Sequence, residues 1–155
     1  MDKFDREILR QLQRDADVPI ARIAETIGIS PAACWRRLQR LQETGVVRGK
    51  VAILDDAKLN AGVTVFVSIR TSDHSAAWVK SFSTALDDIE EVVEIYRMSG
   101  DVDYLLKIKV PDIKAYDAIY RKIIERMHFL DVSSSFAMEQ IKSTTALPLS
   151  YLELD

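Results

Sequence analysis

The sequence predicts an α+β protein of two domains, a helical N-terminal domain followed by a domain that mixes strands and helices. Two observations support this prediction. Within residues 1–54 apolar side chains recur at the three- and four-residue spacing of helices, whereas residues 62–155 combine strict apolar–polar alternation with helical spacing. Between them, residues 55–61 are polar and carry neither pattern, so we place a linker there.

Composition limits the class of protein to a folded, intracellular one. Of the 155 residues 48% are hydrophobic, which is enough for packed cores and too many for a disordered chain. No apolar run approaches the roughly 20 residues of a membrane span, and the charged N-terminus does not resemble a signal peptide. One cysteine cannot form an internal disulfide. We therefore expect a cytoplasmic protein with no membrane partner.

The net charge of −3 conceals a difference between the two domains. Residues 1–60 hold 11 Lys and Arg against 9 Asp and Glu, whereas the remainder holds 10 against 15. Residues 30–50 contain five basic side chains and a single acid, Glu43. A local basic patch matters more for binding a polyanion than the overall charge does.

Three short helices are predicted in the N-terminal domain. Residues 2–14 and 20–27 carry apolar side chains at helical spacing, and a Gly-containing turn leads from the second helix into the third, residues 30–45. Ser30 is suited to cap this third helix and Gly45 to end it. The arrangement indicates a helix-turn-helix, and residues 46–54 are interpreted as a small hairpin, or wing.

The third helix has an apolar and a basic side on a helical wheel. The apolar side consists of Cys34, Trp35, Leu38 and Leu41, and the basic side of Arg36, Arg37 and Arg40. Guanidinium groups suit guanine edges and phosphates, although a lone basic cluster is also an ordinary solvated helix face. Arg37 alternatively pairs with an acid of the first helix. The start of the helix, at Ser30, is also suited to a phosphate.

Two residues of this region have competing interpretations of their own. Lys50, at the tip of the predicted hairpin, is a candidate phosphate contact. Cys34 is expected to be a core residue, because a lone buried cysteine behaves as a small hydrophobic side chain and no second ligand stands at zinc spacing.

The C-terminal domain is predicted to have the order strand-helix-strand-strand-helix-strand, the split arrangement of a ferredoxin-like fold. The strands cover residues 63–70, 91–98, 102–110 and about 132–142, and the helices residues 75–87 and 112–127. With both helices on one face, the other face is predicted to expose apolar side chains: Phe66, Tyr96, Met98 and Leu105. A second copy packing sheet against sheet would cover them, unless a register slip puts some of them under the helices.

Two motifs resemble those of the Lrp/AsnC family, the feast/famine transcription regulators. The first is Arg36-Arg37-Leu38-x-Arg40-Leu41-x-x-x-Gly45-Val46-Val47, and the second is Ser99-Gly100-Asp101-Val102-Asp103-Tyr104-Leu105-Leu106. The resemblance covers essentially the whole chain, and Cys34-Trp35 with Ser134–Lys142 is similar to a DecR-like branch linked to cysteine sensing. It implies a winged helix-turn-helix domain and a ferredoxin-like (ACT/RAM-type) domain that forms dimers, commonly octamers, and binds an amino acid.

The resemblance also implies where the effector binds. From spacing alone, the loop around Gly100 is either a hairpin turn with solvated acids or a site for an ammonium and a carboxylate. By the resemblance, the effector-binding positions are Arg97, Ser99, Gly100, Asp101, Asp103, Ser134, Ser135 and Phe136, although Phe136 is also a candidate core residue. The segment 126–132 is one residue shorter than the usual family turn, which puts an assembly contact in question.

The function expected is a sequence-specific DNA-binding regulator of amino-acid metabolism, with cysteine or a branched-chain amino acid as candidate effector. Its partners would be double-stranded DNA, the effector and itself. The alternative is an architectural DNA-binding protein without a ligand. His74 and His128 are isolated, and no catalytic set, metal site or cofactor motif is present, so we expect no enzyme and no cofactor. The tail, residues 144–149, is interpreted as a strap over the sheet.

Overall fold

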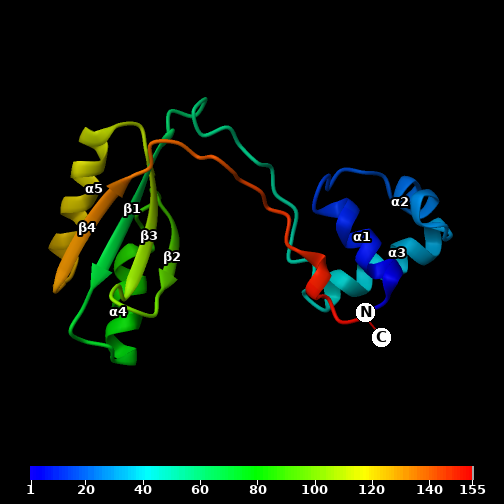
Figure 1. Cartoon of the computed structure of the whole chain (residues 1–155), viewed down its shortest axis with the longest axis horizontal. Coiled ribbons are helices and arrows are strands. Elements are labelled where there is room, and N and C mark those ends of the chain that lie inside the picture. The colour runs from blue at the N-terminus through cyan, green and yellow to red at the C-terminus, as the bar shows by residue number, and fades with distance from the viewer. Residues whose placement is uncertain (155) are drawn as a thin grey trace. The chain divides into compact units, whose positions relative to one another are not determined.

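The structure, a computed structural model, describes residues 1–154, which form two compact units. The first unit comprises residues 1–53 together with the segment from Lys142 onward, and the second comprises residues 54–141. The chain therefore passes between the units twice, after residue 53 and after residue 141 (Figure 1). Within the described residues, no helix is both long and apolar enough to cross a membrane.

The first unit is built on three helices, α1 (Lys3–Leu12), α2 (Ile20–Ile27) and α3 (Pro31–Glu43). The side chain of Asp2 caps α1 by accepting the N–H groups of Phe4 and Asp5. Gly28 ends α2 in the left-handed region, at φ 72°, and the chain turns there into α3. Apolar side chains from all three helices form the core: Ile8, Ile23, Ala24, Cys34 and Leu41. The predicted helix-turn-helix is confirmed.

The predicted hairpin at residues 46–54 is wrong, because the structure contains no strand in this segment. A two-residue hairpin turn needs a positive φ, which Gly45 has and Gly49 lacks. The positive φ is instead used at the end of α3, where the N–H of Val47 donates to the carbonyl of Leu41 at 2.9 Å. Residues 48–54 form neither helix nor strand, and Val51 and Ile53 are exposed.

The second unit is a four-stranded antiparallel sheet with two helices. Its elements are β1 (Val63–Arg70), α4 (Ala76–Leu86), β2 (Val92–Arg97), β3 (Tyr104–Val110), α5 (Ile113–Arg126) and β4 (Asp131–Phe136). The strand order β2-β3-β1-β4 confirms the split βαββαβ prediction. β4 is shorter than predicted because its partner β1 begins at Val63, and Phe136 already pairs with Val65.

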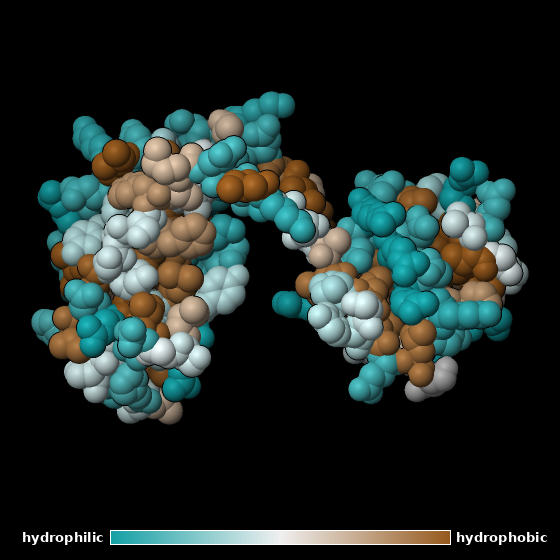
Figure 2. Space-filling view, viewed as in Figure 1, coloured by the Kyte–Doolittle hydropathy of each residue, from teal (hydrophilic) through white to brown (hydrophobic). Residues whose placement is uncertain are grey.

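The two faces of this sheet differ as the alternation predicts. Val65, Val67 and Ile69 are fully buried in a core shared with α4 and α5. On the other face, Phe66 is 36% and Tyr96 is 49% exposed. Figure 2 shows brown apolar side chains among the teal ones on the surface of this unit. Lys107 lies opposite Phe66 in the register and pairs with Glu94, so this face is apolar but not uniformly so.

The C-terminal tail belongs to the first unit, so its interpretation as a strap over the sheet is wrong. The Gln13 side-chain amide donates to the carbonyl of Leu147 at 3.1 Å, and the Leu147 N–H donates back to that amide oxygen at 3.0 Å. A short 3-10 helix, η1 (Leu149–Tyr151), follows beside the helices of the first unit (Figure 1). A side-chain amide offers the same donor and acceptor as a backbone peptide, which is why Gln13 can hold an extended segment.

Candidate DNA-binding and effector sites

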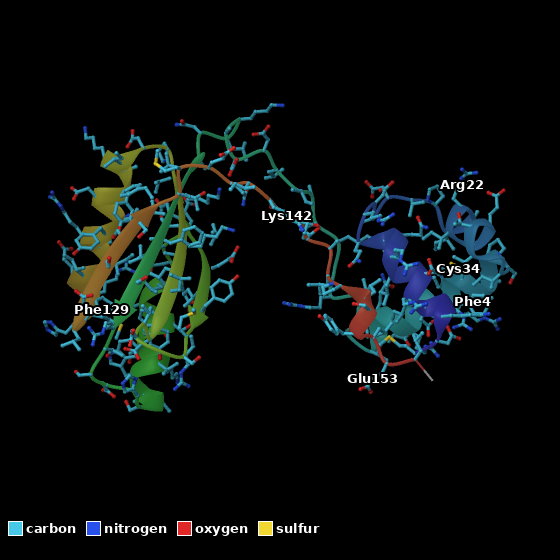
Figure 3. The ribbon with its side chains drawn as sticks, viewed as in Figure 1. Phe4, Arg22, Cys34, Phe129, Lys142 and Glu153 are labelled. Carbon is cyan, nitrogen blue, oxygen red and sulfur yellow. The ribbon has the colours of Figure 1, made fainter. Side chains whose placement is uncertain are left out.

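Helix α3 is anchored by its buried side. Ser30 accepts the N–H of Ala33 at 3.2 Å as the N-cap, and Pro31 occupies the first turn. Cys34 and Leu38 are buried, and Figure 3 shows Cys34 among the helices of the first unit. Burial raises the pKa of the Cys34 thiol, so the neutral form is favoured. This confirms the core interpretation of Cys34.

The most unexpected feature of the first unit is a buried carboxylate against α3. Asp5 of α1 is completely buried, and its two oxygens accept Arg37 Nη1 at 2.9 Å and Arg40 Nη2 at 2.5 Å. Arg37 Nη1 also lies 2.8 Å from an oxygen of Asp2, and its guanidinium stacks 5.3 Å from the ring of Phe4. We call Asp2, Asp5, Arg37 and Arg40 the Asp5 cluster.

The Asp5 cluster favours the charged forms of Arg37 and Asp2. The hydrogen bond to Asp5 raises the pKa of Arg37 further, against the opposing effect of burial. The pKa of Asp2 is lowered, chiefly by the backbone N–H of Asp5 and then by Arg37. Two negative and two positive charges therefore offset one another, and α3 is less basic toward solvent than its sequence indicates.

The structure corrects the helical-wheel division of α3 at two positions. Arg37 is predicted on the basic side, opposite the core, but lies beside α1, with 27% of its side chain exposed. Its pairing with acids of the first helix, the alternative interpretation, is confirmed. Trp35 is predicted on the apolar side but is 52% exposed. Both residues flank the apolar stripe, and a wheel cannot decide which flank another helix covers.

Arg36 differs from the other two arginines. Within residues 1–154 it has no hydrogen bond or ion pair, and it borders a surface hollow of about 340 Å³ with Ala33, Arg37 and Arg40. Such a hollow, rich in N–H donors, suits a phosphate oxygen or the acceptor edge of a base. Contact of Ser30, Arg36, Arg37 and Arg40 with DNA stays a prediction.

Lys50 does not project from the tip of a hairpin. Its ammonium donates to the carbonyl of Ala16, between α1 and α2, at 2.6 Å. This bond holds the extended segment after α3 against the first unit. To contact a phosphate, Lys50 would have to give up the carbonyl of Ala16 or share its ammonium between the two acceptors. The phosphate contact of Lys50 also stays a prediction.

The predicted effector loop lies between β2 and β3. Gly100 has a φ of 119°, which only glycine adopts easily, and it makes the tight turn possible. Asp103 closes the hairpin with its carbonyl, which accepts the N–H of Met98 at 2.8 Å. It also joins the hairpin to the end of β1, since its N–H donates to the carbonyl of Ile69 and its carboxylate accepts the N–H of Thr71 at 2.8 Å. The ring of His74 lies 3.8 Å from the other oxygen of that carboxylate. Asp103 thus has a structural role that the motif did not indicate.

The remaining predicted effector residues lie on β4, across the sheet. Ser134 is hydrogen-bonded to the hydroxyl of Tyr116, and Phe136 packs edge-on against the same ring at 5.2 Å. Burial raises the pKa of the Tyr116 hydroxyl. Ser135 points to the opposite face of the sheet, in register with Phe66.

A single chain does not bring the two groups of effector residues together. β1 and β3 separate β4 from β2, and the spacing of strands puts β4 about 10 Å from the β2–β3 hairpin. Arg97, Ser99, Gly100 and Asp101 are exposed at the hairpin. Ser134 and Phe136 instead border a separate hollow of about 300 Å³ beside α5. Within residues 1–154 no cluster of side chains suits a metal ion.

The sequence allowed an acid of the first helix to pair with Arg37, but it did not identify Asp5 and Asp2 as the partners or place Tyr116 beside Ser134. A signal for Asp5 was present, because Ile8, Leu9 and Leu12 stand three, four and seven residues after it. That spacing puts the acid within the apolar stripe of α1, and a buried acid requires a cationic partner.

Comparisons with known proteins agree with this architecture. Residues 64–147 match the family model described as Lrp/AsnC ligand binding domain, and residues 1–48 match one described as winged helix-turn-helix DNA-binding. The glutamate uptake regulatory protein of Zymomonas mobilis is 44% identical over 96% of this chain and 91% of its own length. The DNA-binding transcriptional activator DecR of Escherichia coli K12 is 43% identical over 96% and 99%.

Solved structures agree as well. An AsnC family transcriptional regulator from Agrobacterium tumefaciens is 56% identical, with a TM-score of 0.95 over 99% of this chain and 100% of its own. The regulator NMB0573 of Neisseria meningitidis, in complex with L-Met, is 29% identical, with a TM-score of 0.92 over 99% of each chain. The named relatives are regulators rather than enzymes, as expected. The chain belongs to the Lrp/AsnC family of DNA-binding transcriptional regulators.

Proposed function

We propose that this protein is a sequence-specific regulator of genes of amino-acid metabolism, acting in the cytoplasm. Helix α3 contacts the operator, and an amino acid bound by the second unit changes the affinity for that operator. The observation that carries the proposal is the exposed Arg36, which has no partner in the described part of the chain and borders a donor-rich hollow on the third helix of a helix-turn-helix. The winged helix-turn-helix match over residues 1–48 supports it.

The effector proposed is an amino acid, with cysteine or a branched-chain amino acid as first candidates. An α-amino acid needs an acceptor for its ammonium and a donor for its carboxylate. Asp101 and Arg97, exposed at the two ends of the turn, offer this pair, and Gly100 leaves the backbone open between them. The L-Met complex of the Neisseria relative supports a ligand of this class.

The protein acts as a homo-oligomer, a dimer that assembles further, up to an octamer. The sheet face with Phe66, Tyr96 and Leu105 supports the first step, since large apolar side chains on a sheet favour a packed partner. A second chain also supports the effector proposal, because the β4 residues Ser134, Ser135 and Phe136 of one chain can then meet the hairpin, including Asp103, of another. Dimeric helix-turn-helix units reach successive turns of the major groove.

A thermal-shift screen of the full chain against the twenty amino acids tests the ligand. We expect one or a few to raise the melting temperature, since a ligand at one hundred times its Kd stabilises by about 2.7 kcal/mol. The same amino acids should then change the affinity for a duplex selected from a random library. A chain that responds to none and selects no common sequence would be an architectural DNA-binding protein instead.

A further inference from the structure

The Asp5 cluster divides the arginines of α3 into two kinds. Arg37 and Arg40 are held by the buried carboxylate of Asp5, which lies on a different helix, so their side chains are fixed toward α1. Arg36 has no such partner within residues 1–154. Of the three arginines on this helix, it is the one whose full charge and donors face solvent.

Trp35 is the neighbouring side chain, and its exposure is unusual for tryptophan. It is 52% exposed, and within the described residues it stacks on no other ring and makes no hydrogen bond. The other tryptophan, Trp78, stacks on Phe82 at 5.0 Å in the core of the second unit. A large indole at the surface of a polar helix leaves much apolar area in water, and burial of that area against a partner is favourable.

Trp35 and Arg36 project from the surface of α3 because the side chains beside them are small. Ala32 stands three residues before Trp35, and Ala33 three before Arg36, so a small side chain lies beside each on the helix surface. Both residues are in the first two turns of α3, counted from its cap at Ser30. In helix-turn-helix proteins the N-terminal part of this helix contacts base edges.

We propose that Trp35 and Arg36 determine the DNA sequence this protein prefers. Arg36 donates to O6 and N7 of a guanine, and the indole of Trp35 packs on the C5-methyl group of a thymine. Arg37 and Arg40 bind backbone phosphates with the donors that the Asp5 cluster leaves free. The inference rests on the proposed function, because it requires that α3 enters the major groove.

The test uses the full chain and a 20-base-pair duplex that it selects from a random-sequence library. In that duplex each thymine is replaced in turn by uracil, which lacks only the methyl group, and each guanine by 7-deazaguanine, which lacks the N7 acceptor. Affinity is measured by fluorescence anisotropy for the wild type, Trp35→Ala, Arg36→Ala and Arg22→Ala. Arg22 of α2 is a matched control, since its loss removes the same charge from an exposed position in the same unit.

For the wild type we expect uracil at one thymine position to weaken binding roughly fourfold, the effect of one buried methyl group. Trp35→Ala should bind thymine and uracil duplexes equally. At one guanine position 7-deazaguanine should weaken binding roughly tenfold, the effect of one hydrogen bond from a charged donor. Arg36→Ala should bind the guanine and 7-deazaguanine duplexes equally. Arg22→Ala should weaken all duplexes alike and keep both preferences.

Two different failures can be told apart. If the wild type selects a sequence and both variants keep its base preferences, the inference is refuted and the proposed function stands. If Trp35→Ala instead changes the oligomeric state in sedimentation and keeps the thymine preference, a second copy covers Trp35 and the inference is likewise refuted. If the wild type selects no sequence at all, the proposed function fails and this inference fails with it.

Discussion

Replacing Asp5 by alanine should destabilise the first unit far more than its place on a surface helix indicates. Its buried carboxylate accepts Arg37 at 2.9 Å, Arg40 at 2.5 Å and the N–H of Asp2 at 3.1 Å. A hydrogen bond to a charged partner contributes about 2 kcal/mol, which we assign to Arg37. Arg40 is 55% exposed, so solvent screening reduces its share to about 0.5 kcal/mol. With the bond from the N–H of Asp2 included, the free energy of unfolding of the first unit should fall by about 3 kcal/mol.

Hydrogen exchange of the full chain, followed by mass spectrometry, separates the two units. A loss of about 3 kcal/mol corresponds to exchange roughly a hundredfold faster in peptides of α1, α2 and α3. Peptides of the sheet serve as an internal reference, because they belong to the other unit. Asp5→Asn keeps the shape and one acceptor but not the charge, so we expect about two thirds of the loss in unfolding free energy that Asp5→Ala causes.

Glu7→Ala is the matched control. It removes an acid from the same helix, paired with Arg10 at the surface, and should cost at most about 0.5 kcal/mol. If Asp5→Ala accelerates exchange no more than Glu7→Ala does, the carboxylate is not a buried ion-pair partner. The distinction between Arg37 and Arg40, which Asp5 binds, and Arg36, which it does not, would then be wrong.

Three further predictions concern the effector hairpin, the helix cap and the sheet face. Asp103→Ala should abolish the thermal shift with the effector and lower the free energy of unfolding by about 1 kcal/mol, since the N–H of Thr71 loses its acceptor. Asp103→Asn keeps an acceptor for that N–H. Loss of calorimetric binding at unchanged stability in Asp103→Asn would show that the effector requires the charge of Asp103, whereas undiminished binding would place the effector site elsewhere. The lowered pKa of Asp2 stabilises the fold above the unfolded value of about 3.9 and ceases to do so as pH falls through the lower folded value. In melts from pH 5 to 3, Asp2→Asn should therefore lose less stability than the wild type, and an equal loss would contradict the cap contribution. Phe66→Lys should shift sedimentation from dimer to monomer, whereas Glu125→Lys on exposed α5 should not, and an intact Phe66→Lys dimer would exclude this face as the interface.

The amino-acid sequence by itself determined the local elements. The cap at Ser30, the turn at Gly28 and the alternation of residues 63–70 each depend on neighbours a few positions away, so they predicted α3, the helix-turn-helix and β1. The order of strands and helices then left few topologies open, and the split βαββαβ sheet is one of them.

Only the tertiary structure decided which side chains of these elements are free. Asp5 meets Arg37 across 32 residues, and Gln13 meets Leu147 across 134, distances over which no periodic pattern carries information. A helical wheel identifies an apolar stripe but not which flank a second helix covers, and α1 covers the side of Arg37 while that of Trp35 stays exposed. The buried carboxylate of Asp5 requires cationic partners, and this requirement determines which arginines of α3 are held by the protein itself.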